Sequence, residues 1–250
     1  MIGVIGFGRF GALTTRYLAQ DYKVLVSSGS QSEATIEAVG ASKASLEDVC
    51  AQPFVVLCVP ISTIRETLKK IAPLIAAGSI VIDVCSVKKY PVDWMQRLLP
   101  GHVNILGTHP MFGPDSADDS LKDRKMVLCN VSTPEGIYQK IRDYLVGKGL
   151  DVIETTPDEH DRQIAVSLSL THFIGRSMAE FGAGTLRIDT EGYKRLTYTL
   201  EVVEHDTWQL FQDMHKFNPY ARRIREDFMA AMHRIDNKLK QYDETDTGDG

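Results

Sequence analysis

The sequence contains little cysteine, no long apolar run and no excess of positive charge. Its four cysteines, Cys50, Cys58, Cys85 and Cys129, are widely spaced and form no Cys-x-x-Cys pair, which predicts reduced, structural thiols and no metal site. No run of about 18 apolar residues is present, so we expect no membrane-spanning helix. The chain has 28 Lys and Arg against 33 Asp and Glu, a net charge of −5, which disfavours nucleic acid as a partner.

The overall composition is that of a globular protein. The 250 residues are 43% hydrophobic and 24% charged, enough for one large domain or two smaller ones. The chain begins at Met1 with a strand-like segment and no charged leader, so we expect a soluble, cytoplasmic protein without a membrane partner. Only residues 241–250 have the polar composition of a disordered tail.

Residues 1–154 alternate short apolar runs with amphipathic segments. The runs are rich in Val and Ile and almost continuous, as in strands that are buried on both faces of a parallel sheet. Between them, residues such as Phe10, Leu13 and Tyr17 repeat at helical spacing. The pattern predicts an α/β fold, a Rossmann-type doubly wound parallel sheet over 1–154, with strands at 2–6, 23–26, 54–59, 79–84, 103–106, 125–129 and 151–153.

The period changes after residue 154. Thr156 to Glu159 forms a capping box with a proline at the first helical position, so a helix should begin there. Apolar residues then recur at helical steps until Gly182, and again over 196–214 and 220–235, which predicts an all-helical domain over 155–240. About ninety residues of helices have difficulty burying all these stripes alone, so we expect a homodimer that pairs through the last two stripes.

A glycine-rich turn follows the first strand. Gly6, Gly8 and Gly11 have the G-x-G-x-x-G spacing, whose glycines permit a tight turn, close approach of a pyrophosphate and close packing of the following helix. That helix would offer its first N–H groups to the phosphates. Three glycines in an ordinary turn are the alternative. We assign cofactor contacts to the whole turn, Gly6, Phe7, Gly8, Arg9, Phe10 and Gly11.

The end of the second strand bears on the choice of dinucleotide. An acidic residue there would bind the ribose of NAD, and this sequence has Ser-Ser-Gly-Ser at 27–30 instead. Ser27, Ser28 and Ser30 can donate hydrogen bonds to a 2′-phosphate, and Arg9 is a nearby cation. We predict NADP as the cofactor, with NAD as the alternative if the serines form only a polar loop.

Polar residues follow the fourth and fifth predicted strands, at the edge where open α/β sheets bind ligands. They form the stretches DVCSVK at 83–88 and GTHPMFGP at 107–114. A histidine such as His109 can accept a hydroxyl proton near neutral pH, and Ser86 and Lys88 can orient substrate or cofactor. Taken singly, His109 can equally be a structural loop residue and Lys88 a solvated charge.

Together these motifs resemble those of the TyrA family of prephenate and arogenate dehydrogenases. The order is GFGRFG, CVP at 58–60, DVCSVK, GTHPMFGP, EHD at 159–161 and LTHF at 170–173, and the resemblance covers about residues 1–220. HPMFGP after SVK is its most diagnostic part. The stretch from Gly192 to Asn218 resembles plant-type arogenate dehydrogenases more than the bifunctional bacterial enzymes, and we expect a monofunctional chain.

The resemblance implies a reaction, an oxidative decarboxylation of a cyclohexadienyl acid. We expect NADP-dependent conversion of L-arogenate to L-tyrosine, with prephenate to 4-hydroxyphenylpyruvate as the alternative. By motif, His109 is the base at the C4 hydroxyl, Ser86 orients this histidine or the hydroxyl, and Lys88 stands near substrate or nicotinamide. The cofactor site would also include Cys58, Val59 and Pro60.

Four later residues are implied to bind substrate: His160, His172, Tyr193 and Asp206. The alternatives are a helix-capping position for His160, a core position for His172 and an exposed helical position for Asp206. An aspartate at 206 would pair with the ammonium of arogenate and repel the keto acid prephenate. The rival functions are another dehydrogenase, acting on β-hydroxy acids or imines, and a non-catalytic nucleotide sensor.

Overall fold

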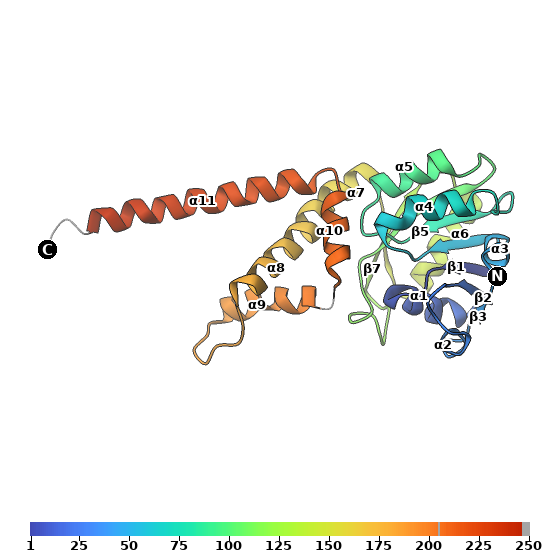
Figure 1. The fold of residues 1–250 in the computed structure, drawn as a ribbon, viewed down its shortest axis with the longest axis horizontal. Helices are drawn as coiled ribbons and strands as arrows, with labels where there is room; N and C mark the ends of the chain where they lie inside the picture. The colour runs from blue at the N-terminus through green and yellow to red at the C-terminus, as the bar shows by residue number, and fades with distance from the viewer. Residues whose placement is uncertain (205, 247–250) are drawn as a thin grey trace. The chain divides into compact units, whose positions relative to one another are not determined.

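The computed structural model describes residues 1–204 and 206–246 and contains two compact units, residues 1–161 and 162–250 (Figure 1). The first unit holds a sheet and the second is helical, as the change of sequence period predicted. The division falls after Asp161 rather than after residue 154, because the first turn of α7 (Pro157–Ile164) belongs to the unit that holds the sheet.

The first unit is built on one eight-stranded sheet with the order β3-β2-β1-β4-β5-β6-β7-β8. The order reverses between β1 and β4, and this reversal is where doubly wound sheets bind dinucleotides. Most strands are apolar and buried, which confirms the predicted Rossmann-type arrangement. Their bounds are β1 (Ile2–Ile5), β2 (Val24–Ser27), β3 (Ser42–Lys43), β4 (Phe54–Leu57), β5 (Ile80–Asp83), β6 (Asn104–Pro110), β7 (Lys125–Asn130) and β8 (Asp151–Glu154).

Two features of the sheet differ from the sequence prediction. β3 was not predicted, because its two residues, Ser42 and Lys43, are exposed and polar and carry no apolar signal. The pairing of β6 with β7 is antiparallel, whereas we predicted a parallel sheet throughout. No helix lies between these two strands, and a parallel return needs a crossover of a dozen or more residues that is usually helical.

Helices cover both faces of the sheet. α1 (Arg9–Ala19) and α6 (Glu135–Gly147) pack on one face, and α4 (Ile61–Ile71) and α5 (Lys89–Leu98) lie beside each other on the other (Figure 1). α4 buries Ile64 and Leu68 completely, which shows why an amphipathic segment follows each buried strand. Two short helices, α2 (Glu33–Glu37) and α3 (Leu46–Cys50), complete the unit.

The described residues of the second unit form helices joined by loops and contain no strand, as predicted. After α7 come a π-helical segment, η1 (Ala165–Leu170), and then α8 (Thr171–Phe181), α9 (Glu191–Glu204), α10 (Trp208–Lys216) and α11 (Ala221–Asp246). Gly182, with φ +83°, ends α8 at the predicted position. The apolar stripe 196–214 is divided between α9 and α10, since Thr207 begins a new helix by accepting the N–H of Leu210 at 3.1 Å.

α11 corrects the expected tail. It continues through Asp246, so residues 241–246 are helical although their composition is polar. Residues 247–250 lie outside the described part of the chain. Over the described residues, no helix has both the length and the apolar character needed to cross a membrane.

Candidate active site

The glycine turn after β1 has the geometry of a pyrophosphate cradle. Gly6 has φ +97°, and a Cβ there would lie 2.3 Å from the carbonyl oxygen of Cys58. A Cβ on Gly11 would lie 2.5 Å from the carbonyl oxygen of Gly6, so α1 packs directly on the turn. Around Gly8 there is open space. The turn is therefore tight. It is closely packed at Gly6 and Gly11 and open at Gly8, which fits a dinucleotide phosphate at the N-terminus of α1.

The serine loop lies beside this turn. The carbonyl oxygen of Ser27 accepts the N–H of Gly6 at 3.0 Å, which joins the end of β2 to the glycine turn. Ser28 is half-buried and Ser30 is exposed. Arg9 is exposed and forms an ion pair with Asp115 at 2.6 Å, so it is already partnered by a carboxylate. A 2′-phosphate would have to compete with Asp115 for this guanidinium.

The other residues that we assigned to the cofactor site differ in how far their side chains are buried. The side chain of Phe7 is buried in the core of the first unit, and the ring of Phe10 lies 6.4 Å from that of Phe112. Phe7 can therefore offer only its backbone to a ligand at the turn, whereas the ring of Phe10 is half-buried. Cys58 donates its N–H to Ile5 at 2.8 Å, and the neighbouring Pro60 is the N-cap of α4. The CVP segment thus lies beside the glycine turn.

Lys88 is not a solvated charge, and its expected place near substrate or nicotinamide stays a prediction. Both it and Asp83 are completely buried, and the ammonium of Lys88 bonds the carboxylate of Asp83. Asp83 also accepts the N–H of Cys85 at 3.0 Å, so the carboxylate holds the loop between β5 and α5. An unpaired charge at such depth would be costly, which makes this pair a structural element of the loop that carries Ser86.

A chain of hydrogen bonds leads from His109 to a buried carboxylate. Nδ1 of His109, on β6, lies 2.9 Å from Nε2 of His160, on α7. Nδ1 of His160 lies 2.8 Å from Oδ1 of Asp161. The two oxygens of Asp161 also accept the N–H groups of Lys88 at 2.7 Å and Lys89 at 2.9 Å, at the start of α5. All three residues of the chain are buried.

This arrangement fixes the tautomers of both histidines. A carboxylate only accepts hydrogen bonds, so Nδ1 of His160 is the donor to Asp161. Neutral His160 then has a bare Nε2, which accepts a hydrogen from Nδ1 of His109. Consequently Nε2 of His109 is left with its lone pair, and no described residue occupies it. His109 is thereby prepared as a proton acceptor.

The surroundings keep His109 neutral. Burial lowers the pKa of His109 well below its ordinary value, and the neighbouring His160 and the Lys88 ammonium lower it further. Burial also lowers the pKa of His160, although Asp161 opposes this effect. The sequence had suggested a group titrating near pH 6 to 7. The buried position of His109 moves that titration to lower pH.

Ser86 lies on the loop between β5 and α5. We expected its hydroxyl to orient His109 or the substrate's hydroxyl, and in the structure Nδ1 of His109 bonds His160 rather than Ser86. The hydroxyl oxygen of Ser86 is itself buried with no partner among the described residues. A buried, unpaired hydroxyl is rare in proteins, so this oxygen is available to a bound molecule.

A separate polar cluster lies within the helical unit. Nε2 of His172 is 3.7 Å from Oδ2 of Asp206, and the guanidinium of Arg176 bonds the carbonyl oxygens of Asp206 and Val203. Nδ1 of His172 and Nε of Arg176 are buried and have no partner among the described residues. These free polar groups are suited to bind an oxygen-rich anion.

Tyr193 has a role inside the helical unit. Its hydroxyl donates to the carbonyl oxygen of Gly184 at 2.8 Å and accepts the N–H of the same residue at 3.3 Å. The hydroxyl therefore ties α9 to the segment after α8. It donates one hydrogen bond and accepts one within the helical unit, and the substrate contact that we expected for Tyr193 stays a prediction.

Sequence reasoning missed three residues of these clusters. Asp161 and Asp83 stood inside the quoted motifs EHD and DVCSVK, yet neither received a role. Arg176 lies four residues after His172, so helical spacing alone could have placed both on one face of α8. Among the residues that the structure describes, no group of three or more His, Cys, Asp or Glu is placed to hold a metal ion.

Family profiles match both halves of the chain. The profile described as "Prephenate dehydrogenase, nucleotide-binding domain" matches residues 20–154, more than half of the sequence. The profile described as "TYRAAT1-like, C-terminal domain" matches residues 177–249.

Two similar curated proteins come from Arabidopsis thaliana. Arogenate dehydrogenase 1, chloroplastic, is 29% identical over 95% of this chain and 39% of its own length. Arogenate dehydrogenase 2, chloroplastic, is 27% identical over 95% of this chain and 69% of its own length. The chain thus spans well under half of the first relative.

Solved structures show the same fold. Synechocystis arogenate dehydrogenase matches with a TM-score of 0.69 and 24% identity, covering 99% of this chain and 98% of that one. Prephenate dehydrogenase from A. aeolicus, in complex with hydroxyphenyl propionate and NAD+, matches with a TM-score of 0.74 and 20% identity, covering 98% and 92%.

Proposed function

The chain belongs to the prephenate dehydrogenase family, and from this premise we propose that it is an oxidoreductase that oxidatively decarboxylates arogenate with NADP. The observation that carries the proposal is the hydrogen-bonded chain Asp161–His160–His109, in the same unit as a pyrophosphate-type glycine turn. It supplies a prepared base and a nucleotide cradle within one unit.

In the proposed reaction, Nε2 of His109 accepts the proton of the substrate's C4 hydroxyl. The positive charge that develops on His109 is partly passed to His160 through their shared hydrogen bond, and Asp161 stabilises it. A bound nicotinamide would supply the acceptor for the C4 hydride, and loss of carbon dioxide would then make the ring aromatic. Ser86 offers its unpaired hydroxyl to the bound substrate or cofactor.

The preference for NADP rests on the end of β2. Ser27 and Ser28 stand where an acidic residue would select NAD, and neither carries a charge that repels a 2′-phosphate. The ion pair of Arg9 with Asp115 reduces the attraction that Arg9 offers, so we assign the preference to the serines first. NAD remains the alternative cofactor.

The preference for arogenate rests on the helical unit. Asp206 is about one-third exposed and keeps one carboxylate edge toward His172. Its negative charge would attract the ammonium of arogenate, and the keto group of prephenate has no matching charge. Arogenate dehydrogenases among the relatives of this chain support the same choice. Prephenate is the alternative substrate.

The test is to measure nucleotide reduction by absorbance with all four pairs of substrate and cofactor. The proposal predicts the highest kcat/KM for arogenate with NADP. Turnover of prephenate alone would move the assignment to prephenate dehydrogenase. Saturable nucleotide binding without turnover of either substrate would instead support the rival function, a non-catalytic nucleotide sensor.

We further propose a homodimer that forms through the helical unit. On α11 the exposed Met232, Ile235, Leu239 and Tyr242 continue from Phe228 at alternating steps of four and three residues, the spacing of a coiled-coil seam. Sedimentation of Ile235→Glu should show a monomer, and the control Asn237→Glu should behave as wild type. A wild-type monomer at micromolar concentration would contradict the proposal.

A cytoplasmic location completes the proposal. It rests on the composition, which is that of an ordinary globular protein. Fractionation of the cells that produce the chain tests it, because recovery with membranes or inside an organelle would contradict it.

A further inference from the structure

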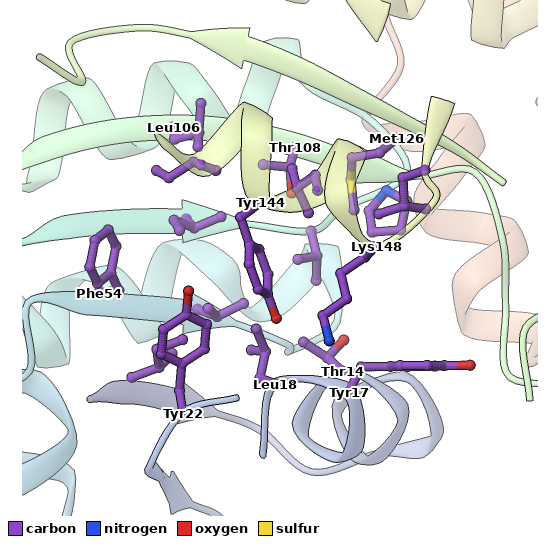
Figure 2. Close-up of a pocket in the computed structure, with 18 of the residues that line it drawn as sticks. Thr14, Tyr17, Leu18, Tyr22, Phe54, Leu106, Thr108, Met126, Tyr144 and Lys148 are labelled. Atoms are coloured by element: carbon purple, nitrogen blue, oxygen red, sulfur yellow. The ribbon is translucent and has the colours of Figure 1, made fainter. Parts of the chain in front are cut away.

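An apolar cavity lies on the face of the sheet opposite to His109. Its volume is about 370 Å³, and it lies between the sheet, α1 and α6 and is partly open (Figure 2). Successive residues of a strand point to opposite faces, so Thr108 and Pro110 line this cavity while His109 between them faces away. We call it the sheet-face cavity; its floor is formed by Ile2, Val56, Ile82, Val84, Leu106 and Thr108.

Polar contacts hold the two helices around this cavity. Asp21, after α1, accepts the hydroxyl of Tyr144 at 2.8 Å and the ammonium of Lys148 at 2.5 Å. The rings of Tyr22 and Tyr144 meet edge to face at 5.3 Å, and Figure 2 shows Tyr144 reaching from α6 toward α1. These contacts fix the spacing of α1 and α6 without filling the space beneath them.

A second set of contacts joins α1 to the segment after β6. Arg16 bonds the carboxylate of Asp118 at 2.8 Å, and the hydroxyl of Tyr17 donates to the carbonyl oxygen of Ala117 at 2.8 Å. Tyr17 lines the cavity, yet its hydroxyl is already used. The walls of the cavity are therefore held in place by hydrogen bonds and ion pairs from α1 and from Asp21, the second residue after it.

The lining favours an apolar occupant over water. The hydroxyls of Tyr17, Tyr144 and Thr108 all have protein partners, so few polar atoms remain to hold ordered water. Protein interiors leave few voids larger than a water molecule, and pockets of this size that are lined by carbon commonly bind small molecules.

The charges at the edge of the cavity favour an anion. Lys140, on α6, and Lys148, the residue that follows this helix, both line it, against one carboxylate, that of Asp21. Lys148 is paired with this carboxylate, whereas Lys140 is exposed and has no ion-pair partner among the described residues. One positive charge is thus available at the mouth of an apolar chamber.

We propose that the sheet-face cavity binds an amphipathic monocarboxylate. Its alkyl or aryl body lies on Val84 and Leu106, and its carboxylate meets Lys140. This site is separate from the candidate active site, since the sheet lies between them, and the proposal stands whether or not the chain is an arogenate dehydrogenase.

The test is calorimetric titration of the full chain with decanoate, below the concentration at which it forms micelles. Decanoate should bind saturably with one site per chain. Decyltrimethylammonium, which has the same body and the opposite charge, should bind at least about tenfold more weakly. Absence of saturable decanoate binding, or equal binding of the cation, would overturn the proposal.

Two pairs of variants locate the site. Val84→Phe fills the cavity and should abolish decanoate binding, while Val146→Phe, on the same helix α6 as Lys140 but outside the lining, should leave it unchanged. Lys140→Glu does not disturb the interior and should weaken the binding of decanoate about five- to tenfold. The matched variant Lys70→Glu, on α4, should leave this binding unchanged. Unchanged binding in Lys140→Glu would place the anion elsewhere and overturn the assignment.

Discussion

Nδ1 of His109 and Nε2 of His160 are 2.9 Å apart, although the two residues are 51 positions apart in the chain. This contact connects the proton acceptor on β6 to Asp161 on α7, and Asp161 in turn holds the start of α5. The relationship makes His160 and Asp161 positioning residues for His109. It also explains why a buried carboxylate follows a buried histidine in the EHD motif.

Asp161→Asn should show whether Asp161 positions His109 or only stabilises the fold. The amide can donate to Nδ1 of His160, which would reverse both tautomers and place a proton on Nε2 of His109. We expect kcat to fall by about 10²-fold or more, with little change in nucleotide affinity.

The matched control is Asp158→Asn, which changes an exposed aspartate of the same helix that bonds Lys89. It should retain near-wild-type kcat. Nitrogen NMR shifts of the His109 ring report which nitrogen carries the proton. Asp161→Asn with an unchanged tautomer would show that Asp161 does not control His109.

The pH dependence of kcat/KM follows from the position of His109. The base works in its neutral form, and burial together with Lys88 lowers its pKa well below the ordinary value. Activity should therefore persist as the pH falls through about 6.5, the ordinary histidine pKa, and should be lost only at lower pH. The pH profile of the purified enzyme checks this, and an acid limb at or above that value would contradict it.

Ser28→Asp tests the choice of cofactor. The new carboxylate at the end of β2 would repel a 2′-phosphate and could bond a ribose 2′-hydroxyl. We expect the dissociation constant of NADP to rise much more than that of NAD. Binding titrations with both nucleotides measure it. Equal weakening of both would mean that the loop only packs, and unchanged NADP affinity would place the 2′-phosphate elsewhere.

Asp206→Asn tests the choice of substrate. Removal of the carboxylate removes its attraction for the ammonium of arogenate and its repulsion of the keto acid. We expect kcat/KM to fall for arogenate and to rise for prephenate, a reversal that general damage to the fold would not produce. If both substrates change by the same factor, Asp206 is not the selector.

The sequence predicted those parts of the site that depend on local pattern. The glycine turn and the strand that precedes it follow from spacing and periodicity, and the structure contains both. We expected His109 to follow a strand at 103–106, whereas β6 continues through Pro110 and includes it. The pairing of Lys88 with Asp83 could not be predicted, because a lysine that follows a strand is usually solvated.

Contacts between segments that are distant in the sequence could not be predicted from local patterns either. His160 could be placed near a helix start, but its contact with His109 depends on how α7 meets β6. The sheet-face cavity has the same origin, because it is the space left when α1 and α6 pack on one face. Apolar residues at helical spacing predict a buried face and give no sign that part of it stays unfilled.

The measurement that tests the central claim most directly is turnover of arogenate by His109→Asn with saturating NADP. Asparagine is close in size but is not a base, so folding and nucleotide affinity should be preserved, as circular dichroism and a binding titration would show. The account predicts that kcat falls by about 10²- to 10⁴-fold relative to wild type. A kcat close to that of wild type would contradict it, because another group would then be removing the proton.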